Sequence, residues 1–590
     1  MTGPRALPSS GARAAVSAGL LAGFVALVDL VRLVRLPLLT DPEPSWAAAR
    51  LLFGLGVAAA ASAAAVLAAS ALCLWAADPR SSCDPAPLPV RPRTLALLAG
   101  GAVLLGLAAR FAALDRVPAW LFLDDVSLID PTLALGGSWS DFADSIRPVP
   151  FGVAKLFGTV GVAYLEGFRL ALKAFGTTVF SLRFPSAFAG AVSLVTAGLL
   201  ARALLPRGGG TLAALALAGL RWHLILSRWG WVMIVLAPVV DIATLLLIRS
   251  RRQSGAKALA AAAAAGAVAG LGAHIYLSAW IAGAALGGFS LWPGASDDNR
   301  RARIRRAMLF GAGFLVAVAP LFLFREGRPL PYFARTGDHN VLREIRYRQS
   351  LEPLFSAAAD SLVAPWLAPD PTSRQDLPGR SRLGWILGIP ALVVFTRALI
   401  RPREELSGLL LLHALAALAA TLVAGEALNP NGARFCYLAT LTAVAVAAGI
   451  QLILAAIAPA HRHAAAVGAV GLLAVAGALG ARDALLVWPE LEGTFDGFHG
   501  ADTLMGRAAA RWEELGRVDV ARGLGHSSVT TGSVRRYRLD PQPPLSPGGG
   551  RARDFRVEAP GSAPAPPERV VERVRDTWGR EWAVVVGRKQ

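Results

Sequence analysis

The chain has 590 residues, of which 54% are apolar and 17% are charged, and its formal net charge is +19. Soluble domains carry about 25% charged residues, whereas here long apolar runs recur along the chain and much of the positive charge falls in the short loops between them. This placement argues against a nucleic-acid-binding protein, since Lys and Arg next to apolar runs mark the side of a membrane on which a loop lies.

Apolar runs of membrane-spanning length account for most of the chain. A helix of roughly 20 apolar residues crosses the hydrocarbon core, and only a helix satisfies its own backbone groups there. The sequence therefore predicts an all-α polytopic membrane protein of about thirteen transmembrane helices. These are expected near residues 14–36, 47–77, 94–114, 184–205, 211–227, 231–249, 257–274, 275–292, 307–324, 383–400, 405–425, 435–457 and 464–487.

The basic residues alternate between successive loops. One set of loops is rich in arginine, whereas the short loops of the other set hold Arg228 or Arg434 alone, or no basic residue. Because basic loops stay in the cytoplasm, the N-terminus is expected on the cytoplasmic side. The long loops 115–183 and 325–382 and the tail from Trp488 are expected outside.

The tail, residues 488–590, has the composition of a small soluble domain. Asp502–Gly516 has an amphipathic helical pattern, and residues 527–531 and 582–586 have β-like patterns. A Pro/Gly-rich stretch, 541–567, divides the tail. We expect a soluble extracytoplasmic α/β module.

An acidic pair, Asp124-Asp125, follows the predicted span 94–114 and ends the Pro- and aromatic-containing stretch 115–125. Repulsion between adjacent carboxylates and an apolar setting raise one pKa, which suits a general base or a metal ligand. The alternative is an ordinary solvated turn, since Asp pairs are common in loops.

The segment 91–125 resembles the opening of the GT-C glycosyltransferases, such as the protein O-mannosyltransferases and the bacterial aminoarabinose transferases of lipid A. In that superfamily the first outer loop begins with an Asp-Glu pair whose Asp is catalytic; here Asp125 stands in the Glu position. Similar motifs follow in the same order along residues 91–487. They are Lys173-Ala174-Phe175-Gly176-Thr177 with Ser181-Leu182-Arg183-Phe184-Pro185-Ser186, then Leu224-Ile225-Leu226-Ser227-Arg228, then Gly270-Leu271-Gly272-Ala273-His274-Ile275-Tyr276-Leu277, then Asn429-Pro430-Asn431-Gly432-Ala433-Arg434-Phe435.

The resemblance implies three parts of the chain. Residues 1–90 would form an extra transmembrane hairpin and a cytoplasmic loop, residues 91–487 a GT-C-like core, and residues 488–590 the extracytoplasmic domain. It also implies a multi-pass protein of the bacterial cytoplasmic (inner) membrane.

The implied activity is that of an inverting glycosyltransferase. It would move a sugar from a polyprenyl-phosphate donor to a lipid, protein or glycan acceptor on the extracytoplasmic face, because nucleotide sugars stay in the cytoplasm. Asp124 is the expected catalytic base, with Asp125 as its catalytic partner. No cofactor or metal is expected, a divalent cation being the less favoured alternative.

The other candidate site residues are substrate-binding ones. Arg228 and Arg434 are expected to hold the donor phosphate, because a guanidinium binds phosphate in a bidentate manner; the alternative is contact with lipid headgroups. Lys155 is a phosphate candidate from its loop position. His274 and Tyr276 are candidates at a helix end, where a core histidine and an interfacial tyrosine are the alternatives.

Two other function classes remain open. O-antigen ligases or polymerases are also polytopic with arginines in outer loops, but they lack an Asp pair directly after an early span. A transporter or flippase would depend on charges within spans, of which Asp241 is one.

Overall fold

The computed structural model describes residues 84–134, 162–293, 299–323, 341–355, 375–377, 380–424, 432–513, 517–520, 528–539, 554–560 and 568–588. The predicted hairpin 14–77 and the loop residue Lys155 lie outside this part of the chain.

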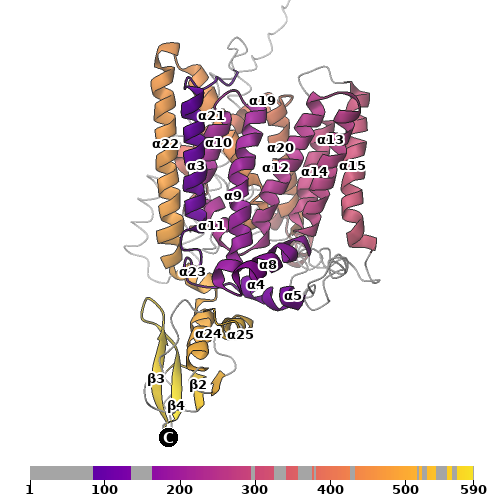
Figure 1. The fold of residues 1–590 in the computed structure, drawn as a ribbon. Coiled ribbons are helices and arrows are strands. Elements are labelled where there is room, and N and C mark those ends of the chain that lie inside the picture. Colours follow the sequence, from indigo (N-terminus) through magenta and orange to yellow (C-terminus); the bar gives the residue numbers. More distant parts are fainter. Residues whose placement is uncertain are drawn as a thin grey trace, which may run out of the picture.

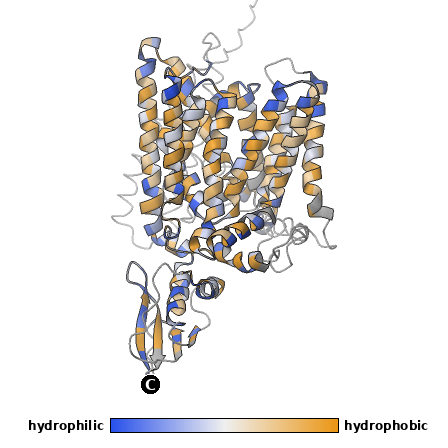
Figure 2. Cartoon of the chain, viewed as in Figure 1, coloured by the Kyte–Doolittle hydropathy of each residue, from blue (hydrophilic) through white to orange (hydrophobic). Residues whose placement is uncertain are grey.

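A bundle of apolar helices forms the body of the protein, and Figure 2 shows that hydrophobic residues dominate its middle. The helices run side by side between two ends (Figure 1). They are α3 (Pro92–Phe111), α9 (Val179–Leu204), α10 (Gly209–Ala218), α11 (Arg221–Arg228), α12 (Leu236–Arg252), α13 (Gly255–Leu271), α14 (Ser278–Leu291), α15 (Arg300–Leu323), α19 (Gly384–Ile400), α20 (Glu405–Ala424), α21 (Leu438–Ala456) and α22 (Arg462–Arg482).

Every predicted span that falls on described residues coincides with one of these helices or with a consecutive pair of them. By length and composition, six helices in the described part are able to cross a membrane, or up to eight if each bent pair is one span. The bent pairs are α10 with α11, at 59°, and α19 with the first part of α20, at 98°. The protein is therefore an integral membrane protein, and the predicted count of about thirteen spans is not confirmed.

Small residues let neighbouring helices approach closely. A side chain at Gly266 of α13 would meet the Phe310 carbonyl oxygen of α15 at 1.9 Å, and one at Gly313 would meet the Ala263 carbonyl oxygen at 2.1 Å. Because lipid tails are as apolar as the helices themselves, association depends on such close packing. The Ala- and Gly-rich composition of these runs is thus a packing feature.

Short helices cover one end of the bundle. At this end α4 (Leu123–Ser127), α5 (Ile129–Ala134) and α8 (Val162–Phe175) lie across the spans (Figure 1). Several long helices break there into 3-10 turns, η1 (Val232–Val235), η2 (Gly272–His274) and η3 (Gly432–Phe435). Of these, η1 packs against η3, and η2 packs against α8. Irregular backbone near a membrane is tolerated where protein buries it.

The C-terminal module extends from the same end of the bundle (Figure 1). After α22 the chain passes through a π-helical turn, η5 (Asp483–Val487), and η6 (Trp488–Glu490) into α23 (Glu492–Gly497) and α24 (Gly500–Glu513). A four-stranded sheet follows in the order β1-β2-β4-β3, from β1 (Arg517–Val520), β2 (Asp554–Glu558), β3 (Glu568–Arg575) and β4 (Glu581–Arg588). β1 pairs with β2 in parallel, and the other two pairings are antiparallel.

The core of this module lies between α24 and the sheet, where Met505, Ala508 and Ala509 pack with residues such as Phe555 and Val585. The predicted α/β module is confirmed, as are its helix near residues 502–516 and its strand near 582–586. The strand predicted from the β-like pattern at 527–531 is wrong for residues 528–531, the part that the structure describes.

These residues begin α25 (Ser528–Arg536) instead. Tertiary contacts outweigh the strand preference of Val529 and Thr530. A Cβ on Gly506 would lie 2.8 Å from the Thr531 carbonyl oxygen, so α25 packs closely onto α24.

Candidate functional site

The acidic pair lies in α4, at the end of the bundle that carries the C-terminal module (Figure 1). The side chain of Asp124 lies outside the described part of the structure. Asp125 is buried, with 1% of its surface exposed. A Cβ placed on Gly230 would lie 3.4 Å from the Asp125 carboxyl group, so the segment between α11 and η1 passes directly beside the carboxylate. Asp125 is therefore an interior carboxylate, and the alternative of a solvated turn does not apply to it.

Tyr164 of α8 lies next to this carboxylate. Its hydroxyl donates a hydrogen bond of 3.0 Å to the carbonyl oxygen of Gly230. Burial raises the pKa of Tyr164, and the nearby charge of Asp125 acts in the same direction. The phenol thus stays protonated at neutral pH and holds the Gly230 backbone beside Asp125.

Arg183 of α9 supplies a buried positive charge close to Asp125. Its guanidinium donates to the carbonyl oxygens of Leu114, at 3.0 Å, and Trp120, at 2.8 Å. Asp125 and Arg183 attract each other electrostatically. A single arginine thereby fixes the backbone that leads into α4 and offsets the charge of the carboxylate.

Arg228 does not extend into an outer loop, because it is the last residue of α11 and is fully buried. Its two terminal nitrogens donate to five backbone carbonyl oxygens at 2.8–3.2 Å, those of Ala109, Arg110, Ala112, Ala113 and Val117. These carbonyls belong to the last turn of α3 and the turn that follows it, where Ala113 has φ = 47°. Arg228 thus caps the C-terminal end of α3. Its contacts in this structure are those of a structural cap, and the phosphate-binding role expected from the sequence stays a prediction.

The remaining predicted residues that the structure describes lie in or next to the 3-10 turns η2 and η3. Arg434 is partly exposed in η3, which packs against η1, the turn that follows Gly230 and Trp231. His274 Nε2 lies 2.8 Å from the Ala317 carbonyl oxygen and joins η2 to α15. Tyr276 is buried, at 5% exposure. Arg434 is thus linked to the acidic helix through η1 and the Gly230 segment, and His274 makes a contact typical of a core histidine.

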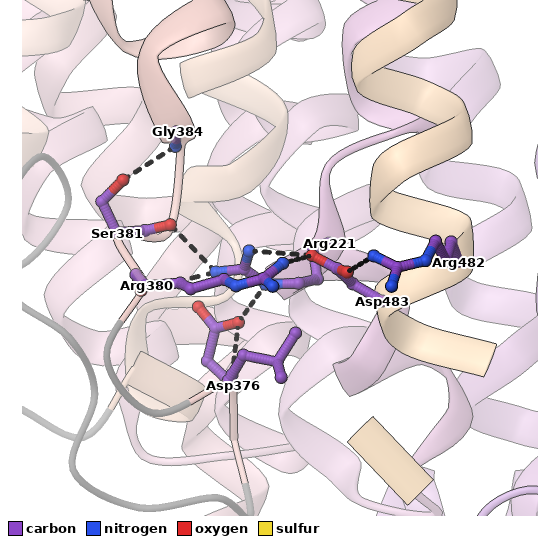
Figure 3. Close-up of polar contacts among 8 residues, drawn as sticks. Arg221, Asp376, Arg380, Ser381, Gly384, Arg482 and Asp483 are labelled. Atoms are coloured by element: carbon purple, nitrogen blue, oxygen red, sulfur yellow. Dashed lines mark hydrogen bonds and ion pairs between the residues drawn. The ribbon is translucent and has the colours of Figure 1, made fainter. Parts of the chain in front are cut away.

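An ion-pair network ties the end of the second long loop to the bundle (Figure 3). Arg221, the first residue of α11, pairs with Asp376 at 2.7 Å and with Asp483 at 3.5 Å. Arg380 pairs with the same Asp483 oxygen at 2.6 Å. Arg221 also donates to the Ser381 carbonyl oxygen at 2.9 Å. The network holds residues 375–377 and 380–383 against the break between α10 and α11.

Asp241 is buried among helices rather than beside α4. Thr196 of α9 and Thr440 of α21 donate hydrogen bonds of 2.6 and 2.7 Å to its two carboxyl oxygens. The carboxylate thus cross-links α9, α12 and α21. In the described part of the chain, no group of three or more His, Cys, Asp and Glu residues is placed to hold a metal ion.

The structure therefore brings Asp125, Tyr164, Arg183 and Gly230 together, and three of these four were not predicted as site residues. Arg183 lies in one of the motifs that resemble the GT-C glycosyltransferases, Ser181–Ser186, but its partners are two backbone carbonyls that no sequence pattern indicates. Tyr164 lies at the end of the predicted first outer loop, where an isolated tyrosine has no distinguishing context.

We expect Gly230→Ala to damage the site. The added methyl group would lie 2.8 Å from the Leu182 carbonyl oxygen and 3.4 Å from the Asp125 carboxyl group. Overpacking of this kind costs about 1–3 kcal/mol, and the displaced carboxylate should lower the rate of the sugar transfer expected from the sequence about tenfold or more. Thermal unfolding in detergent and a transfer assay measure the two effects. Gly167→Ala in α8 is the matched control, because a Cβ there meets no atom within 4 Å; equal behaviour of the two variants would contradict the packing argument.

Comparisons with known proteins returned no matching family model and no matching curated protein. Solved structures do match. ArnT from Cupriavidus metallidurans in the apo state is 17% identical, with a TM-score of 0.43, covering 84% of this chain and 97% of that chain. ArnT from the same organism bound to undecaprenyl phosphate is 14% identical, with a TM-score of 0.40 and coverages of 84% and 98%.

The Archaeoglobus fulgidus oligosaccharyltransferase tethered with an acceptor peptide containing the NVT sequon also matches. It is 14% identical, with a TM-score of 0.44, covering 77% of this chain and 60% of that chain.

Proposed function

We propose that this protein is an inverting glycosyltransferase that takes its sugar from a polyprenyl-phosphate donor. The observation that carries the proposal is the acidic helix α4, which holds Asp124 and Asp125 at the end of an apolar bundle, with Asp125 buried beside Tyr164, Gly230 and Arg183. A carboxylate at a membrane surface, held by a preorganised set of contacts, is suited to deprotonate a hydroxyl next to a lipid-borne substrate.

The proposed reaction is a single displacement at the anomeric carbon. The acceptor hydroxyl oxygen attacks that carbon, its proton passes to the Asp124 carboxylate, and the bond between the anomeric carbon and the phosphate oxygen breaks. Polyprenyl phosphate leaves with the bonding electron pair. Because the attack comes from the face opposite the phosphate, the anomeric configuration inverts.

Asp125 assists Asp124 by position and charge in this proposal. Arg183 attracts Asp125 electrostatically and offsets its charge, which weakens the repulsion that Asp125 exerts on the neighbouring carboxylate. Tyr164 and Gly230 hold the surrounding backbone.

Arg434 is the guanidinium that we propose for the donor phosphate. It lies in η3, which contacts η1, and η1 follows the Gly230 segment beside Asp125. Arg228 is not assigned this role, because its terminal nitrogens are engaged by backbone carbonyls. Lys155, Tyr276 and His274 remain candidates for donor contacts from the resemblance. The proposed chemistry uses no metal or other cofactor.

The proposed location is a bacterial inner membrane, with α4 and the C-terminal module on the extracytoplasmic face. The module and α4 share one end of the bundle (Figure 1), as this topology requires. The basic starts of α15 and α22, at Arg300 and Arg462, lie at the opposite end, in accord with cytoplasmic retention of basic loops. In this proposal, residues 1–90 add a hairpin to the catalytic core 91–487, and residues 488–590 are extracytoplasmic.

The test of this function is transfer of a radiolabelled sugar by the purified protein. A panel of polyprenyl-phosphate sugars is incubated with the protein and a membrane extract, and the labelled product is identified. We expect label in a lipid, protein or glycan product, with release of polyprenyl phosphate. Asp241→Asn should retain transfer, because the amide still accepts a hydrogen bond from a threonine hydroxyl. A panel with no transfer by the wild-type protein would refute the proposal, and loss of lipid movement in Asp241→Asn would favour a transporter.

A further inference from the structure

The C-terminal module contacts the backbone that leads into the acidic helix. Arg507 of α24 donates a hydrogen bond of 2.8 Å to the carbonyl oxygen of Ala119. One turn earlier on the same helix, the Thr503 hydroxyl accepts a hydrogen bond of 3.1 Å from the Leu121 amide. The same hydroxyl donates to the His499 carbonyl oxygen at 3.1 Å, which orients its lone pair toward Leu121. Thr503 and Arg507 are both buried, at 0% and 7% exposure.

The membrane bundle holds the same backbone from the other side. The Trp120 carbonyl oxygen, between the two groups bound by α24, accepts from Arg183 of α9 at 2.8 Å. Residues 119–121 are thus bound alternately by the module and by the bundle. Asp124 follows this segment by three residues along the chain.

Aromatic side chains fill the same interface. The Trp120 ring packs edge-on against Phe495 of α23, with centroids 4.8 Å apart. Phe122 packs against Phe498 at 6.0 Å, and both rings contact Trp229, the residue after α11. Edge-to-face aromatic pairs favour one relative orientation of the packed elements.

The sheet of the module is linked to this interface through Phe495. Arg580 lies in the turn between β3 and β4. Its guanidinium lies over the rings of Phe495, Trp578 and Trp582, at 5.4, 5.1 and 5.3 Å from the ring centroids. Arg580 also pairs with Asp576 at 2.5 Å. The module therefore contacts the segment as a connected unit, and not only through one helix.

The module also binds the far side of the acidic helix. Asp130, at the start of α5, accepts a hydrogen bond of 3.1 Å from Arg536 and a further bond from the Tyr537 hydroxyl. Burial and the hydrogen bond to Asp130 raise the pKa of Tyr537 to about 12, so the phenol is a donor at neutral pH. In addition, α25 packs against α4 itself.

We propose that the C-terminal module positions the acidic helix for catalysis, with Thr503 and Arg507 as its positioning residues. This inference rests on the proposed glycosyltransferase function. The module contacts the chain before α4 at residues 119–122 and after it at Asp130. Arg183 of the bundle binds the Trp120 carbonyl oxygen from the opposite side. A base that must meet both a lipid-borne sugar and an acceptor hydroxyl needs such support, since a displacement of about 1 Å can cost about 100-fold in rate.

Paired variants at Thr503 test the inference. Thr503→Val keeps the shape of the side chain but removes the acceptor for the Leu121 amide, whereas Thr503→Ser keeps the hydroxyl. Arg507→Lys keeps the charge but loses the planar fork that reaches both the Ala119 and Leu539 carbonyl oxygens. Arg573→Gln is the control within the module, because Arg573 is half exposed and pairs with Glu581 in the sheet, away from residues 119–122.

Hydrogen–deuterium exchange of peptides covering residues 119–127 is measured in the full-length protein, together with kcat and KM for the donor. Thr503→Val and Arg507→Lys should increase exchange in this segment and lower kcat by about 10- to 100-fold, with KM for the donor unchanged. Thr503→Ser and Arg573→Gln should match the wild type in both respects. If the melting temperatures of Thr503→Val and Arg507→Lys equal that of Thr503→Ser, general unfolding is excluded as the cause of the faster exchange and the lower kcat.

The outcomes separate the two proposals. Exchange unchanged in both Thr503→Val and Arg507→Lys would overturn the positioning role, whatever the activity. A higher KM with unchanged kcat would also overturn it, because the module would then act in donor binding. Faster exchange in these variants, with no Asp124-dependent transfer by the wild-type protein, would refute the glycosyltransferase function and with it a catalytic role for the positioning contacts.

Discussion

Replacing Asp124 by Asn should lower the turnover of sugar transfer by about a thousandfold, within the range that a general base contributes. The amide has nearly the shape of the carboxylate but cannot accept the proton of the acceptor hydroxyl. Because the change affects the transition state more than the bound substrate, KM for the polyprenyl-phosphate donor should change little. Initial rates with the labelled donor identified in the panel assay measure both constants.

Asp115→Asn is the matched control for this substitution. Asp115 lies before α4 in the same segment, but its side chain is half exposed and pairs with the exposed Arg116. It should retain wild-type turnover. If Asp124→Asn keeps more than a tenth of the wild-type rate, another group must take the proton, and Asp125→Asn is then the variant that shows whether its neighbour does so.

Replacing Arg228 by Met should destabilise the protein by about 3 kcal/mol or more, because hydrogen bonds to a charged group are worth about 1.5–3 kcal/mol each and their partners would remain buried. Five carbonyl oxygens at the end of α3 would lose the guanidinium donor, and only that of Ala113 is shown to keep backbone amide donors, those of Arg116 and Val117. Thermal unfolding of the detergent-solubilised protein measures the loss. Arg228→Lys should recover only part of the stability, because an ammonium group lacks the planar fork of donors.

Arg116→Gln is the control for Arg228, since its side chain is 71% exposed and its partner is Asp115. It should leave the melting temperature unchanged. An Arg228→Met protein with wild-type stability but a raised KM for the donor would restore the phosphate-binding role that the sequence had predicted. Arg434→Gln, in contrast, should raise that KM without a large change in stability.

The sequence singled out the acidic pair Asp124-Asp125 and Arg228 for the same reason, a charge near the outer ends of spans. The structure separates them. Asp125 remains part of a site because Arg183 and Tyr164, from other helices, surround it. Arg228 becomes a helix cap because the end of α3 folds back against α11. The charge of each residue was evident from the sequence, but its partner was not.

The sequence by itself determined the class of protein, the positions of the apolar helices in the described chain, and the nature of the C-terminal module. Hydropathy is a property of a local window of residues, and the membrane imposes helical structure on every apolar run that crosses it. The amphipathic pattern of α24 and the β-branched run of β4 are local in the same sense, so they were also predicted correctly. The β-like residues 527–531 were not, because packing of α25 onto α24 decided their conformation.

Tertiary structure alone decided which groups surround the acidic helix. Arg507 binds the Ala119 carbonyl across 388 residues of sequence, and Thr503 binds the Leu121 amide across 382. The sequence does not indicate which distant backbone group a hydrogen-bonding side chain will contact, because any arginine can donate to any carbonyl oxygen. The fold selects the partner by burying both groups in the same place, where each is costly to leave unpaired.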